Sequence, residues 1–195
     1  MRKIPRHCEN PIDNFLIDIA DWISPKLYSM GFTPNMITTI GVILRGFSVY
    51  YLLKNQKNKF LILAIFSYFL DCLDGHYARK YNMCTKFGDY YDHVTDLIYD
   101  GILLFILIKY STLSKAQLFG VMGFLATIKL LFLYHLGCQE NIYQCQGDTC
   151  SVFFQPLKQF CQTNPDNVQL SKYFGCGTQA LAVYLTIYFI PLSFK

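Results

Sequence analysis

The sequence predicts an all-α, polytopic membrane protein with an N-terminal interfacial amphipathic helix and about five to six transmembrane helices. Two observations support this fold class. Of the 195 residues, 53% are hydrophobic and only 15% are charged, whereas about 25% of the residues in soluble proteins are charged. Long apolar runs alternate with short basic or polar connections, as in helices that cross a bilayer. At this length we expect one membrane domain over residues 1–195.

The first predicted element is a helix over residues 10–30. Asn10 and Pro11 form a typical helix start, with a capping asparagine and a proline in the first turn. Apolar residues then recur at helical spacing, and aspartates occupy the opposite face. We therefore expect this helix to lie along the membrane interface, with Trp22 among the headgroups and an end near Pro25. The aspartates also interrupt the apolar core that a secretory signal peptide would need.

Five membrane spans are expected after this helix. They cover residues 36–53, 60–78, 88–109, 113–136 and 174–194. Residues 137–173 are mixed and polar, so we expect one long cysteine-containing loop with a short interfacial helix at 152–160. If five spans are counted, this loop and the connection 79–87 lie on the same side of the membrane.

Four aspartates at the ends of neighbouring spans are the strongest functional signal. Asp71 and Asp74 are three residues apart, and Asp92 and Asp96 are four apart, so each pair shares one helix face. Carboxylates gathered this closely repel one another unless cations lie between them. Oxygen ligands suit Mg²⁺ or Mn²⁺ better than Zn²⁺. Two such ions can clamp the attacking and leaving oxygens of a phosphoryl displacement.

Small residues and one arginine complete the pattern. The chain reads Asp71-x-x-Asp74-Gly75-x-x-Ala78-Arg79, then eight residues, then Gly88-x-x-x-Asp92-x-x-x-Asp96. This stretch resembles the full motif of the class I CDP-alcohol phosphotransferases (CDP-alcohol phosphatidyltransferases), with every motif residue at the family's spacing. The resemblance covers about residues 10–136 and includes Pro34-Asn35 at the start of the first span.

The resemblance implies an enzyme that transfers a substituted phosphate from a CDP-alcohol to an acceptor alcohol and releases CMP. Asp71, Asp74 and Asp92 would bind the metal ions, with Asp96 at the edge of the metal site and acting as general base. The implied CDP-binding residues are Asp71, Asp74, Gly75, Ala78, Arg79 and Gly88. The resemblance also implies a homodimer and a cytosolic active site. On the cytosolic side of the membrane, the thiols after residue 137 should be reduced.

The identity of the substrates is left open between two subgroups. The segments D-G-H-x-A-R and N-x-x-T-K-F-G resemble phosphatidylinositol synthases, which favours CDP-diacylglycerol as donor and a small polar alcohol, inositol, as acceptor. Leu97 departs from that subgroup, which usually has arginine there. Asp92-His93 instead resembles choline and ethanolamine phosphotransferases, which use CDP-choline or CDP-ethanolamine with diacylglycerol but are usually much longer.

The sequence leaves open the roles of several polar residues outside the motif. Asp100 either extends the polar cavity toward the acceptor or pairs with Arg45 or Lys129, and we expect the pair because all three fall within predicted spans. Arg45 and Lys129 could instead bind the phosphate of the lipid or of the acceptor. Thr38 either packs the first span or lines the nucleotide pocket. His93 is expected to be a hydrogen-bonding neighbour of the acids and not a metal ligand.

Two readings from other functional classes also remain. A cation pathway would not require Gly75, Ala78 and Arg79 at these offsets, and a non-enzymatic scaffold would normally have lost an acid. The net charge of +4, with no evident basic face, gives no reason to expect nucleic acid as a partner.

Overall fold

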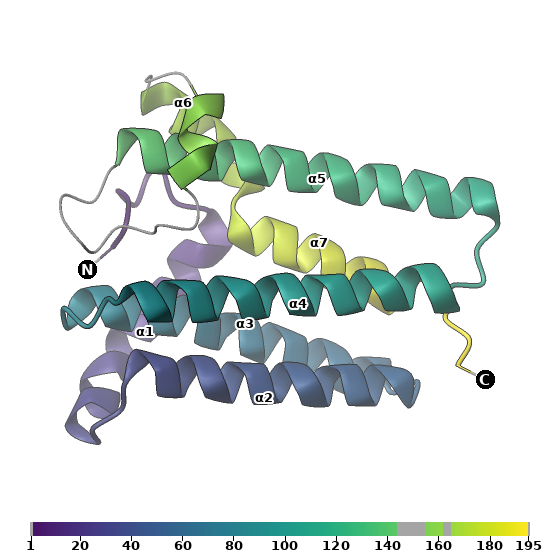
Figure 1. Ribbon diagram of the computed structural model, residues 1–195, viewed down its shortest axis with the longest axis horizontal. Helices are drawn as coiled ribbons and strands as arrows, with labels where there is room; N and C mark the ends of the chain where they lie inside the picture. The colour runs from purple at the N-terminus through teal and green to yellow at the C-terminus, as the bar shows by residue number, and fades with distance from the viewer. Residues whose placement is uncertain (1, 144–154, 162–164, 195) are drawn as a thin grey trace.

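The computed structural model describes residues 2–143, 155–161 and 165–194. The α-helices are α1 (Pro11–Ser29), α2 (Pro34–Leu53), α3 (Lys57–Lys80), α4 (Lys86–Tyr110), α5 (Lys115–Ile142), α6 (Pro165–Ser171) and α7 (Cys176–Phe189), and two 3-10 helices are η1 (Gln155–Phe160) and η2 (Lys172–Phe174). Helices α2, α3, α4, α5 and α7 run side by side, α1 crosses one end of this bundle, and α6 lies at one end of α5 (Figure 1). These residues contain no β-strand beyond one isolated bridge, so the prediction of an all-α fold is confirmed.

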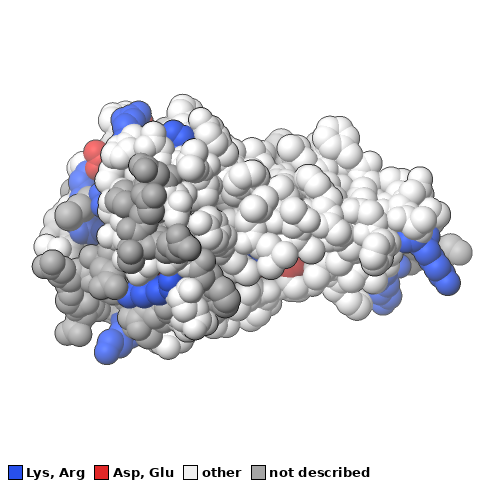
Figure 2. Space-filling view, turned by 90° about the horizontal axis from the view of Figure 1, so that it is seen from above, with Lys and Arg blue, Asp and Glu red and all other residues white. Residues whose placement is uncertain are grey.

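Three helices, α2, α3 and α5, are long and apolar enough to cross a membrane. On the face shown in Figure 2, lysines and arginines gather at two ends, and the band between them is almost free of charge. This distribution is that of an integral membrane protein. The other two predicted spans, on α4 and α7, are not among these three, and α7 has only 14 residues.

Helix α1 begins as predicted but does not end at Pro25. The side chain of Asn10 accepts a hydrogen bond from the backbone N–H of Ile12, and Pro11 occupies the first turn. Pro25 lacks the N–H that would bond the carbonyl of Asp21, and Lys80 donates to this carbonyl instead, at 3.0 Å. The helix therefore continues to Ser29.

The two ends of the helix bundle have different interiors. Away from the acids, α2, α3, α4 and α7 enclose the largest apolar cluster, formed by Leu52, Phe60, Ala64, Tyr99, Leu103, Ile106, Leu107, Ala180, Tyr184, Ile187, Ile190 and Leu192. At the other end, the helices enclose polar and charged side chains, among them Asp74 and His76. The close packing at the apolar end fixes how the helices approach one another at the polar end.

The structure differs from the predicted loop over residues 137–173. Helix α5 continues to Ile142 because its last turns have partners: Glu140 is paired with Lys3, and Gly137 lies so close to η1 that a Cβ there would be 2.5 Å from the carbonyl oxygen of Leu157. The 3-10 helix η1 occupies part of the segment where a short helix was expected, while residues 152–154 lie outside the described residues.

A disulfide joins Cys138 on α5 to Cys161, which directly follows η1. The expectation of reduced thiols after residue 137 is therefore wrong for this pair. The disulfide is buried together with Ile4, Cys8 and Val168. This cluster joins the N-terminal residues, the end of α5 and α6, which are far apart in sequence.

Candidate active site

The first two acids lie on the last turns of α3. Asp71 and Asp74 share one face of this helix, as their spacing predicts. Asp74 is buried, and the hydroxyl of Thr38 on α2 donates a 2.5 Å hydrogen bond to its Oδ2. The close packing of α2 along α3 makes this contact possible. Thr38 therefore packs α2 against α3, and it also lines a cavity beside Asp74.

The other two acids lie on the first turns of α4. Thr85 precedes this helix, and its hydroxyl accepts a 3.0 Å hydrogen bond from the backbone N–H of Gly88. Asp92, His93 and Asp96 each offer one possible ligand atom, and these atoms lie within 4.8 Å of one another. The Nδ1 of His93 is also 3.5 Å from Oδ2 of Asp92. His93 is thus the neighbour of the acids that the sequence predicts, in a position that also suits a metal ligand.

Arg45 of α2 links an acid of α3 to an acid of α4. Its Nη2 donates to Oδ1 of Asp71 at 2.7 Å, and its Nη1 lies 2.5 Å from Oδ1 of Asp96. A guanidinium has several donors in a fixed plane, which suits a bridge between two carboxylates. The bridge offsets the repulsion between the acids. Asp100 pairs with Lys129 at 3.1 Å, so of its two expected partners Lys129 is the one it binds.

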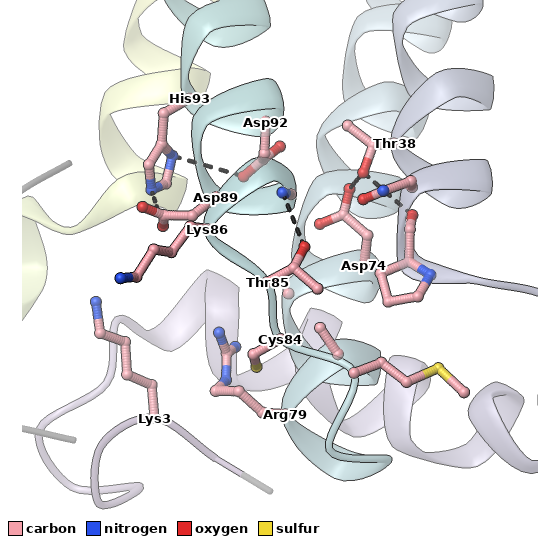
Figure 3. A pocket seen from close by; sticks show the side chains of 16 residues that line it. Lys3, Thr38, Asp74, Arg79, Cys84, Thr85, Lys86, Asp89, Asp92 and His93 are labelled. Carbon is pink, nitrogen blue, oxygen red and sulfur yellow. Dashed lines mark hydrogen bonds and ion pairs between the residues drawn. The ribbon is translucent and has the colours of Figure 1, made fainter. Parts of the chain in front are cut away.

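A first cavity of about 150 Å³ lies among α2, α3 and α4 (Figure 3). Motif residues in its wall are Asp74, Gly75, Ala78, Arg79, Gly88 and Asp92. A Cβ at Gly88 would lie 3.0 Å from Oδ1 of Asn35, and one at Gly75 would lie 3.3 Å from Nη1 of Arg79, so larger residues would crowd this wall. Within the described part of the chain, no hydrogen-bond acceptor faces the buried Nε of Arg79.

A second cavity, of about 260 Å³, is lined by the remaining two acids, Asp71 and Asp96. Its other walls come from α2, α5, η1 and α7 as well as α3 and α4. Its polar residues include the Asp100–Lys129 pair and Gln179, whose Nε2 is 3.4 Å from Oδ2 of Asp100. The four acids are thus divided between two cavities. His93 lines both of them, so the cavities adjoin at the first turns of α4.

The acidic residues fit a hard divalent cation. Oδ1 of Asp92 is buried and has no hydrogen-bond partner among the residues that the structure describes, although burying an unpartnered carboxylate oxygen is costly. Carboxylate oxygens with one imidazole nearby suit Mg²⁺ or Mn²⁺. Asp92, His93 and Asp96 form the compact set, Asp74 shares the first cavity with Asp92, and Asp71 reaches Asp96 through Arg45.

Sequence reasoning missed two contacts of this site. Arg45 was considered as a partner of Asp100 or of a phosphate, but it binds two of the motif acids, and Asp89 lies 3.2 Å from Nε2 of His93. The i, i+4 spacing of Asp89 and His93 was a usable local signal. No local signal showed which acids Arg45 would reach, since that depends on how α2 crosses α3 and α4.

The comparisons with known proteins agree with the motif. The family model for CDP-alcohol phosphatidyltransferase matches residues 32–164, which is more than half of the chain. No solved structure matches the chain significantly.

Three curated relatives indicate the range of the family. Over 84 residues, the chain is 39% identical to archaetidylinositol phosphate synthase of Pyrococcus horikoshii, covering 43% of this chain and 44% of the relative. It is 32% identical over 92 residues to CDP-diacylglycerol–glycerol-3-phosphate 3-phosphatidyltransferase of Aquifex aeolicus, covering 47% of this chain and 50% of the relative. It is 36% identical over 80 residues to CDP-diacylglycerol–inositol 3-phosphatidyltransferase of Saccharomyces cerevisiae, covering 40% and 36%.

These alignments span half or less of each relative. The family model is the broader finding, because it includes both ends of the motif and the helices that hold the four acids. On this match, the chain belongs to the CDP-alcohol phosphatidyltransferase family.

Proposed function

We propose that the protein is a phospholipid-synthesising transferase, which moves a substituted phosphate from a CDP-alcohol to an acceptor alcohol and releases CMP. The observation that supports this most directly is the arrangement of the motif. Its four acids lie on facing turns of α3 and α4, at the walls of two adjoining cavities. One cavity can hold the nucleotide and the other the acceptor, and the acids lie where the two substrates would meet.

The first cavity is the proposed CDP site. Arg79 presents a permanent positive charge there, and the unpartnered N–H of its guanidinium can donate to a phosphate oxygen. Gly75, Ala78 and Gly88 leave room for the ligand to approach the backbone closely. Asp71, which the motif also assigns to CDP binding, would act from the adjoining cavity.

The proposed metal ligands are Asp71, Asp74, Asp92 and Asp96, with His93 beside them. The family is in general dependent on a divalent metal, and the oxygen-rich residues here favour Mg²⁺ or Mn²⁺. When bound, such ions would supply positive charge against the phosphate oxygens. The chain's own acids, held by Thr38 and Arg45, fix where that charge can lie.

Asp96 is the proposed general base. It lines the second cavity, from which an acceptor hydroxyl would approach. The hydroxyl oxygen forms a bond to the phosphorus that carries the donor's alcohol, and the proton passes to the Asp96 carboxylate. The bond from this phosphorus to the bridging oxygen breaks, and CMP leaves with that electron pair. The Arg45 guanidinium favours the ionised, proton-accepting form of Asp96, against the opposing effects of burial and the neighbouring acids.

We further propose CDP-diacylglycerol as donor and a small polar alcohol, inositol, as acceptor. Relatives whose names include inositol support this choice, and so do the charged and amide groups in the second cavity. Transfer from CDP-choline or CDP-ethanolamine to diacylglycerol is the second candidate, favoured by Asp92-His93 and by Ile37-Thr38 with Gly41. A cytosolic active site and a homodimer complete the proposal by family analogy.

A CMP-release assay on purified protein in detergent tests the reaction. CDP-diacylglycerol, CDP-choline and CDP-ethanolamine are each combined with inositol, inositol phosphate, glycerol phosphate, serine and diacylglycerol, with and without Mg²⁺. We expect metal-dependent release with CDP-diacylglycerol and a polar acceptor. Activity only with CDP-choline or CDP-ethanolamine would overturn the donor assignment. No release with any pair, from protein that binds CDP, would favour the non-enzymatic scaffold.

A further inference from the structure

The N-terminal segment, residues 2–10, lies beside the opening of the first cavity. Two arginines attach it to α1: Arg2 donates to Asn14 at 2.7 Å and to Asp18 at 2.5 Å, and Arg6 donates to Asp18 at 2.7 Å. Farther along, Cys8 is buried in the cluster that contains the Cys138–Cys161 disulfide. The segment is therefore fixed at several points.

This attachment places Lys3 in the wall of the first cavity. Its ammonium is paired with Glu140 near the end of α5, and only 22% of its side chain is exposed. Figure 3 shows Lys3 extending toward Lys86, with Arg79 beside it. Lys3, Arg79 and Lys86 thus come from three separate parts of the chain and line one cavity.

We infer that Lys3 is a phosphate-binding residue of this cavity, supplied from outside the segment that the family model matches. This inference rests on the proposed function, because the anion it requires is the phosphate of a cytidine nucleotide. An ammonium has three N–H donors, and the pair with Glu140 leaves donors that can reach a phosphate oxygen. Arg79 and Lys86, the other two cations of this cavity, lie within residues 32–164, whereas Lys3 comes from outside them.

Glu140 is the positioning residue in this arrangement. It is buried, so its carboxylate needs a cation, and Lys3 supplies one. The pair holds a long, flexible side chain at the cavity before the nucleotide arrives, which reduces the entropy lost on binding.

The test measures competition of CDP, CMP and cytidine against radiolabelled CDP in the full-length protein. Lys3→Met should raise the dissociation constants of CDP and CMP about tenfold, the scale of one charge-assisted contact. Binding of cytidine, which lacks phosphate, should stay unchanged. Lys3→Arg should retain most of the affinity. Lys26→Met is the matched control, because it removes one positive charge at an exposed lysine of α1 outside the cavity wall.

Lys3→Met alone leaves the buried Glu140 without its partner, so Lys3→Met combined with Glu140→Gln provides a second variant with no unpaired charge. It should show the same loss of CDP and CMP affinity. Unchanged CMP affinity in either folded variant, or an equal loss for cytidine, would overturn the inference. Wild-type protein that binds CMP but releases none from any CDP-alcohol would instead overturn the proposed function, and the role of Lys3 in phosphate binding would still be decided.

Discussion

The two cavities that meet at α4 are constructed differently. The first is lined mainly by two short stretches of chain, residues 34–38 and 74–93, with Lys3 added from the N-terminus. The second is lined by side chains from six elements, which are α2, α3, α4, α5, η1 and α7. A local motif can specify the first cavity almost completely, whereas the second depends on the packing of the whole bundle. The difference explains why the sequence indicates a CDP-alcohol more clearly than it indicates an acceptor.

The largest expected effect tests whether the acids serve both cavities. Asp92→Asn should lower turnover by about 10³-fold, because it removes a charged ligand at the position where phosphoryl charge develops. EDTA should abolish the wild-type activity, and Mg²⁺ or Mn²⁺ should restore it. CMP release by steady-state kinetics is the measurement, and Asp21→Asn, at an exposed acid on α1 outside both cavities, is the control. An active Asp92→Asn enzyme would contradict the metal-site proposal.

The next effect tests whether Arg45 joins the two halves of the site. Arg45→Met leaves Asp71 and Asp96 without their buried cation, which should lower the free energy of unfolding by roughly 3–5 kcal/mol. Since a divalent cation can replace part of the lost charge, Mg²⁺ should raise the Tm of Arg45→Met more than that of wild type. Thermal unfolding in detergent with and without Mg²⁺ measures both. A Tm equal to that of wild type would show that the bridge has little structural importance.

Two variants should show, through the KM of each substrate, which substrate binds in which cavity. Gly88→Ala places a methyl group 3.0 Å from Oδ1 of Asn35 and should raise the KM for the CDP-alcohol about tenfold, with little change for the acceptor. Lys129→Met removes the partner of Asp100 in the second cavity and should raise the KM for the acceptor by a similar factor. If each variant changes both KM values equally, then the assignment of one substrate to each cavity is wrong.

The smallest effect concerns the N-terminal residues beside the first cavity. Burial, together with the nearby carboxylate of Asp13, raises the pKa of Glu9 to about 7, against a value of 4.5 in the unfolded chain. Between pH 4.5 and about pH 7, the Glu9 carboxyl keeps its proton in the folded protein but releases it in the unfolded chain. The free energy of unfolding therefore falls as the pH rises through this range.

Glu9→Gln should remove this pH dependence. At pH 8 the free energy of unfolding of the variant should exceed that of wild type by roughly 1–3 kcal/mol. At pH 5 the two free energies of unfolding should differ little. Denaturation at both pH values measures the effect. A wild-type protein whose stability rises from pH 5 to pH 8 relative to the variant would contradict it.

The contrast between the two cavities also explains what could be predicted from the sequence. The acids of α3 and α4 and the small residues among them follow from i, i+3 and i, i+4 spacing within single helices. The partner of Asp74 on α2, the bridge through Arg45 and the entry of Lys3 depend on contacts between segments that are distant in sequence. The disulfide was unpredictable for the same reason, since several cysteines follow residue 137 and spacing does not select a pair.

The shared wall at His93 has a consequence for inhibitor design. Because this side chain lines both cavities, a compound that links a cytidine phosphate to a polar alcohol could occupy both at once by passing His93. The second half of such a compound would bind at high effective concentration once the first half is in place. Its linker length would then report the separation of the two substrates on the protein. Related transferases with different acceptor cavities could be distinguished by varying only the alcohol half.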